Sequence, residues 1–137
     1  MDVGSRAVLS APETRCEMIA RALTTGGEII SRGLMVGEVE GVKGHLECRG
    51  LILKGGGRIY AVPELDGRVE GVDMSHEAAV GKIARDEVEY LMARGLSEDQ
   101  AVATIVRGFM HVDIEGLPPV LKEQIDYAIE LSEQSLL

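Results

Sequence analysis

Apolar and polar positions alternate along the first part of the chain, from about residue 5 to residue 83. Short apolar stretches recur there between glycine-containing turns at 26–27, 41–44 and 55–57, and the spacing of amphipathic helices is absent. Alternation with a period of two is typical of strands, because successive side chains of a strand point to opposite faces. We therefore expect this part to consist of short strands.

An Arg-Gly-Leu motif followed by two apolar residues occurs at Arg32 and again at Arg49, an offset of 17 positions. Repeats near this length favour a β-solenoid, in which each coil buries its face against the next, and we interpret the offset as one coil. A β-sandwich is the alternative. Aligning the copies predicts one small and apolar face and one polar face, the first with Leu46, Cys48, Gly50 and Ile52, the second with His45, Glu47 and Arg49. Cys48 is thus expected to point inward.

From residue 84 onward the apolar positions repeat at helical spacing. The first stripe is Ala84, Val88, Leu91 and Met92, and Gly95 is a natural stop for that helix. Ser97-Glu98-Asp99-Gln100 predicts a capping box at the start of a second helix, with a buried stripe of Val102, Ile105, Val106 and Phe109. A third amphipathic helix follows Pro118-Pro119, with Leu121, Ile125, Ala128 and Ile129.

We expect residues 1–83 to form a β core and residues 84–137 a helical segment, in one compact unit.

Composition and charge limit the partners, the location and the kinds of site that we expect. The 137 residues carry a formal net charge of -9, which repels phosphate backbones and anionic lipid, so we expect neither nucleic acid nor membranes as partners. No apolar run approaches the ~20 residues that span a bilayer, and the start of the chain does not resemble a secretory leader, which predicts a cytosolic protein. Cys16 and Cys48 are too few for a disulfide framework or a four-thiolate metal site.

Four stretches together resemble the C-terminal core of the SufB/SufD family, the scaffold subunits for iron-sulfur cluster assembly. They are Val-Glu-Gly-Val-Lys-Gly-His-Leu-Glu-Cys-Arg-Gly-Leu-Ile-Leu at 39–53, Ser-His-Glu-Ala-Ala-Val-Gly-Lys-Ile at 75–83, Glu-Tyr-Leu-Met-Ala-Arg-Gly-Leu-Ser-Glu-Asp-Gln-Ala at 89–101 and Ile-Val-Arg-Gly-Phe at 105–109. The likeness covers nearly the whole chain from Gly4 onward. The sequence at His76-Glu77 is more similar to SufB than to SufD, which usually has Gly in the second position.

The resemblance implies a right-handed parallel β-helix followed by a small helical segment. It also implies that two scaffolds pair through their β-helices, as a homodimer or with a SufB- or SufD-like chain, and that the helical segment docks the ATPase SufC. The protein would be a scaffold and not an enzyme. A transient iron-sulfur cluster would be held by Cys48, His76 and Glu77, with a histidine from the partner scaffold. Family members are longer and carry an interior cysteine that receives sulfur, and we do not assign that role to Cys16.

The residue types suit a labile cluster. Iron-sulfur clusters prefer thiolates, and imidazole or carboxylate ligands hold them more weakly, so a single cysteine fits assembly and release. The alternative for Cys48 is a small buried hydrophobe. His76 and Glu77 alternate along one strand and are expected on opposite faces, so a shared cluster needs a bulge or strand end between them. His45 and Glu47 are candidates for an outer shell of ligands.

Other residues have simpler explanations. We expect His111 at a helix end and Gly55-Gly56-Gly57 in a solenoid turn, because no nucleotide-binding motif follows those glycines. Two other functions remain open. One is a structural module that keeps the dimer and ATPase surfaces but binds no metal, and the other is an enzyme with Cys48 as nucleophile and His76 as base.

Overall fold

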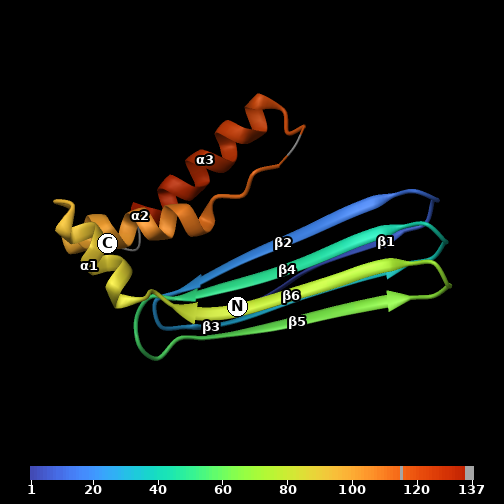
Figure 1. Ribbon diagram of the computed structural model, residues 1–137, viewed down its shortest axis with the longest axis horizontal. Coiled ribbons are helices and arrows are strands. Elements are labelled where there is room, and N and C mark those ends of the chain that lie inside the picture. The colour runs from blue at the N-terminus through green and yellow to red at the C-terminus, as the bar shows by residue number, and fades with distance from the viewer. Residues whose placement is uncertain (115, 135–137) are drawn as a thin grey trace. The chain divides into compact units, whose positions relative to one another are not determined.

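The computed structural model describes residues 1–114 and 116–134, with residues 132–134 described by their backbone alone. Strands come first and helices follow, as Figure 1 shows. The strands are β1 (Asp2–Leu9), β2 (Arg15–Thr24), β3 (Glu28–Gly37), β4 (Lys43–Ile52), β5 (Arg58–Gly67) and β6 (Asp73–Lys82), and the helices are α1 (Arg85–Ala93), α2 (Glu98–Met110) and α3 (Pro119–Gln134). The chain divides into two compact units, Met1–Lys82 and Ile83–Leu137.

Successive strands alternate between two parallel sheets. One sheet has the order β1-β3-β5 and the other β2-β4-β6, and every pairing is parallel. Each coil of the chain therefore adds one strand to each sheet, which is the topology of a β-helix-like solenoid. This confirms the expected parallel β-helix followed by helices. It excludes the β-sandwich, whose sheets are antiparallel.

The coils are longer than the repeated motif suggested. Arg15 pairs with Lys43, 28 residues on, and Lys43 pairs with Asp73, 30 residues on. The interpretation of the 17-residue offset as one coil is therefore wrong, because Arg32 and Arg49 lie on β3 and β4, in opposite sheets. The two motifs look alike because both strands bury small and apolar side chains in the same interior. A period of two predicts which face is buried but not which sheet a strand joins.

The turns that join β3 to β4 and β5 to β6 share a sequence motif. Gly-x-Val-Glu-Gly-Val occurs at 37–42 and again at 67–72, 30 positions apart. The second glycines, Gly41 and Gly71, have φ values of 80° and 76°, and Glu13 has 61° in the turn that joins β1 to β2. The Gly41 amide donates to the Gly71 carbonyl at 3.0 Å, so these turns stack. The other turns include 53–57, where Gly55-Gly56-Gly57 joins β4 to β5 as expected.

The core of the solenoid lies between the inner faces of the two sheets. Its buried cluster consists of Leu9, Met35, Val42, Leu46 and Cys48. Glycines allow the sheets to approach: a Cβ atom at Gly33 would lie 2.5 Å from Cδ1 of Leu46. In the described part of the chain β6 is an edge strand, with a neighbour on one side only, and most of its residues are exposed.

The helical unit contains the capping and stop signals that the sequence predicted. The capping box is present, since Gln100 N donates to Ser97 Oγ and Ser97 N donates to the Gln100 side chain. Gly95 has a φ of 99° just after α1, as a helix stop requires. His111 is the C-cap of α2, which confirms its helix-end position.

The buried stripe of α2 is only partly as predicted. Val106 is buried, whereas Val102, Ile105 and Phe109 are half-buried. The fully buried side chain that the prediction omitted is Ala101. In contrast, α3 leaves much of its apolar surface exposed, with 64% of Val120 and 45% of Leu121 accessible to solvent.

Candidate functional site

The candidate residues lie on β4 and β6, which are neighbours in one sheet. Their pairing runs without interruption from Lys43 opposite Asp73 to Ile52 opposite Lys82. Because neighbouring residues of a strand point to opposite faces, each candidate belongs to the inner or the outer face of this sheet. The two faces offer different chemistry.

Cys48 lies on the inner face of β4, as predicted. It is 3% exposed and belongs to the hydrophobic core. Burial raises the pKa of the Cys48 thiol, and a hydrogen bond with Ser31 partly offsets this effect. The side chain is therefore a protonated thiol at neutral pH, and any metal bound there must displace the proton.

His76 lies on the same inner face, one strand further along. It pairs with Leu46, whereas Cys48 pairs with Ala78, so Cys48 and His76 are diagonal neighbours. Side chains in this relation lie about 7–8 Å apart, within reach of a long side chain or a bridging group. His76 is exposed because β6 is an edge strand of the sheets that the structure describes.

Glu77 lies on the outer face, opposite Glu47 in the pairing. Its side chain is 54% exposed. The regular register leaves no bulge between His76 and Glu77, so their predicted opposite orientation is confirmed. The structure thus brings Cys48 and His76 to one face and places Glu77 on the other.

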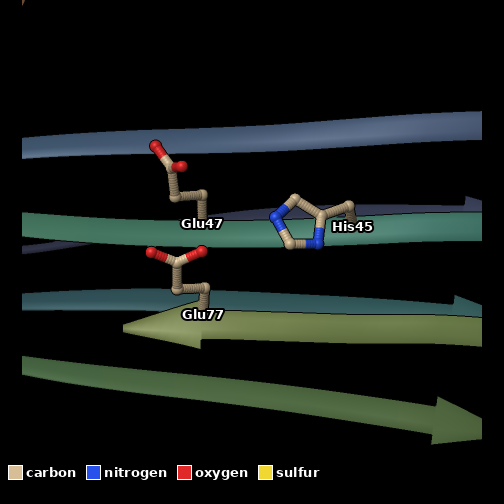
Figure 2. Close-up of side chains that lie close together, drawn as sticks. All are labelled: His45, Glu47 and Glu77. Carbon is tan, nitrogen blue, oxygen red and sulfur yellow. The ribbon is translucent and has the colours of Figure 1, made fainter. Parts of the chain in front are cut away.

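The outer face gathers a set of ligand-type side chains that was not predicted as a group. His45 and Glu47 of β4 and Glu77 of β6 each offer a ligand atom, and these atoms all lie within 4.8 Å of one another. Figure 2 shows the three side chains grouped on these strands. His45 and Glu47 were expected only as outer-shell candidates. The sequence signal that could have joined Glu47 to Glu77 is the 30-residue spacing of the Gly-x-Val-Glu-Gly-Val turns.

Two arginines neutralise the outer-face carboxylates. Glu47 accepts from Arg21 and forms an ion pair with Arg49 at 3.0 Å, and the same Arg49 nitrogen lies 3.3 Å from Glu77. The hydrogen bond from Arg21, together with the nearby positive charges, lowers the pKa of Glu47. The imidazole Nδ1 of His45 is 2.9 Å from the hydroxyl of Ser75.

Cys16 is the second cysteine of the chain. It pairs with Gly44 on the inner face, packs against the core and is half-buried. Burial raises the pKa of its thiol as well. In the part of the chain that the structure describes, no helix is both long and apolar enough to cross a membrane.

Comparison with known proteins places the chain in a family. A family model described as "SUF system FeS cluster assembly, SufBD core domain" matches residues 1–109. An iron-sulfur cluster assembly SufBD family protein of Archaeoglobus fulgidus is 53% identical over 137 residues, which are 100% of this chain and 37% of that protein. A relative with the same family name from Methanothermobacter thermautotrophicus is 50% identical over 133 residues, 96% of this chain and 32% of its own length.

The likeness extends to bacteria. A SufBD family protein of Staphylococcus haemolyticus is 29% identical over 134 residues, 96% of this chain and 28% of that protein. This chain spans about a third of the length of the Archaeoglobus and Methanothermobacter relatives. The family model covers all six strands, α1 and all but the last residue of α2. The chain belongs to the SufBD core domain family of the SUF system for iron-sulfur cluster assembly.

Proposed function

We propose that this chain is a SufB-like, cytosolic scaffold that holds a nascent iron-sulfur cluster with Cys48, His76 and Glu77. The observation that carries the proposal is the placement of Cys48 and His76 on one face of the neighbouring strands β4 and β6, with His76 on the edge strand. A thiolate and an imidazole are cluster ligands, and so small a set holds a cluster loosely enough to release it. Glu77, on the opposite face, joins only if the edge strand rearranges.

The edge also suits pairing with a second scaffold. β5 and β6 each have one hydrogen-bonded neighbour in the sheets, and they end the described solenoid. An exposed strand edge presents unpaired backbone groups on which another chain can add a strand. A second copy, or a SufB- or SufD-like chain, would cover His76 and supply a further ligand.

Reconstitution tests the ligand assignment. The chain is treated anaerobically with iron and sulfide, and visible absorption and Mössbauer spectra are recorded for wild type, Cys48→Ala, His76→Ala and Glu77→Gln. We expect the cluster to be lost with Cys48→Ala and weakened with His76→Ala. Cys16→Ala is the matched control and should keep it. A cluster that survives Cys48→Ala contradicts the assignment.

The helical unit is proposed to dock a SufC-like ATPase, to which ATP hydrolysis would belong. Support comes from the exposed apolar side chains of α3. Val120 is 64% exposed, Leu121 45% and Tyr127 62%. Surface patches of this kind mark interaction sites.

Co-purification with the ATPase tests the docking surface. Leu121→Asp should abolish capture of the ATPase, whereas Val69→Asp, which changes an equally exposed residue (44%) in a solenoid turn, should not. Circular dichroism verifies that both variants fold. Equal capture by both variants would place the docking surface elsewhere.

A structural module that binds no metal is the second candidate function. The burial of Cys48, at 3% exposure with a raised pKa, favours it, because an inert core cysteine has these properties. This candidate predicts ATPase capture and scaffold pairing with no cluster in any reconstituted sample. The two functions thus differ in the spectra and agree in the capture assay.

A further inference from the structure

We propose that His45, Glu47 and Glu77 bind a first-row divalent metal ion on the outer face of the β2-β4-β6 sheet (Figure 2). This site goes beyond the proposed cluster ligands, because Cys48 and His76 lie on the inner face. Glu77 is the residue that the two proposals share. The chemical class is an ion such as Fe²⁺ or Mn²⁺, bound without sulfur.

The geometry is close to that of a bound ion. The three ligand atoms lie within 4.8 Å of one another. Nitrogen and oxygen ligands bind such ions at about 2.0–2.2 Å, so ligand atoms around one ion are separated by about 3–4 Å. Closing the set requires movements of about 1–2 Å, which side-chain rotation supplies. His45 and Glu47 share the rigid central strand β4, and the exposed Glu77 provides the mobile ligand.

His45 is already oriented for this role. Its Nδ1 is 2.9 Å from the Ser75 hydroxyl on β6, which leaves Nε2 available. Figure 2 shows that the ring edge carrying this second nitrogen faces Glu47 and Glu77. Histidine ligands of metals commonly hold their other ring nitrogen in such a hydrogen bond, which fixes the orientation of the ring.

Arg49 shows that the position between the carboxylates accepts positive charge. One nitrogen of Arg49 lies 3.0 Å from Glu47 and 3.3 Å from Glu77, so the guanidinium bridges both. Its side chain is 44% exposed and free to swing into solvent. A divalent ion would take its place, and one imidazole with two carboxylates is a donor set suited to first-row divalent ions.

The same arrangement predicts the effect of replacing Arg49, which competes with a metal ion for the two carboxylates. Arg21 and Arg49 together balance the charges of Glu47 and Glu77, so an incoming ion meets a neutral set. Without Arg49 the set carries a net negative charge, which attracts the ion, and no displacement is needed. Arg49→Gln should therefore strengthen binding by about tenfold.

Manganese binding tests the site. Mn²⁺ is added to the anaerobic full chain, and the electron paramagnetic resonance signal of free Mn²⁺ reports binding, because Mn²⁺ prefers nitrogen and oxygen ligands to thiolate. We expect saturable binding, weakened by about tenfold or more in His45→Ala and in Glu77→Gln, each of which removes a direct ligand. Glu77→Gln changes an exposed side chain and should leave the fold intact, so a loss of binding would report the lost ligand.

The inner-face variants are matched controls. His76→Ala removes a histidine from the neighbouring strand, and Cys48→Ala removes the thiol, so both should bind Mn²⁺ like wild type. Binding that is absent from wild type and from Arg49→Gln overturns the proposal, and so does equal loss in His45→Ala and His76→Ala. Because Mn²⁺ needs no sulfide, failure here is distinguishable from failure of the reconstituted cluster.

Discussion

At the scale of single residues, Cys48 combines a thiol with the environment of a core side chain. Its burial and raised pKa predict slow reaction with a thiol reagent at neutral pH, because the thiolate is the reacting species. In single-cysteine variants, the Cys48 thiol should react with dithiobis(nitrobenzoate) more slowly than the half-buried Cys16 thiol. Stopped-flow absorbance measures both rates.

The denatured chain is the control for this comparison. In urea the two thiols should react at similar rates, because the difference belongs to the fold. If Cys48 in the folded chain reacted as fast as in urea, the solenoid would open at this strand far more often than a packed core permits, and the assigned burial would be wrong.

The ionisation of Glu47 makes the free energy of unfolding depend on pH. Its pKa is lowered in the folded state, chiefly by the hydrogen bond from Arg21, so its contribution is complete above the unfolded value near 4.5 and is lost as pH falls through the lower folded value. Glu47→Gln should cost about 1 kcal/mol at pH 7. The stability difference between wild type and variant should shrink below pH 4.5, as measured by urea unfolding.

Glu70→Gln serves as the matched substitution, since Glu70 is exposed in a solenoid turn. It should leave the free energy of unfolding unchanged to within about 0.5 kcal/mol. A stability difference for Glu47→Gln that stayed constant from pH 7 down to pH 3 would show that the ion pair with Arg21 does not contribute in solution.

At the scale of elements, close contact between the two sheets depends on glycine. A Cβ atom at Gly33 would lie 2.5 Å from Cδ1 of Leu46, which is itself 1% exposed and has no room to move. Gly33→Ala should therefore destabilise the solenoid by about 1–3 kcal/mol, as overpacking does. Gly55→Ala, in an open turn, is the control.

The two alanine variants restrict the unfolded chain equally, so their difference reports contacts in the folded state. Urea unfolding monitored by circular dichroism gives both values. If Gly33→Ala were as stable as Gly55→Ala, the sheets would be further apart than the structure places them.

Local signals in the sequence predicted the elements well, and the long-range pairing less well. The capping box at Ser97 and the stop at Gly95 depend on neighbouring residues, and both are present. The inward orientation of Cys48 was predicted correctly although the coil length was wrong. Alternation reveals a buried face, whereas the 28- and 30-residue register depends on turns that stack through space.

At the scale of the whole molecule, the same limit applies to the candidate site. Family resemblance predicted Cys48, His76 and Glu77 as cluster ligands, and alternation separated the last two by face. It could not bring Glu77 beside His45 and Glu47, because that contact follows only from the pairing of β4 with β6. Residues 30 positions apart become neighbours once the coil length is known.

We propose that a paired scaffold holds a cluster through Cys48. Anaerobic native mass spectrometry of the reconstituted chain tests it most directly, because one spectrum gives the number of chains and the bound iron and sulfide. We expect a dimer that carries a cluster in wild type and a dimer without iron or sulfide in Cys48→Ala. Identical iron and sulfide content in both dimers, or a cluster found on monomers alone, would contradict it.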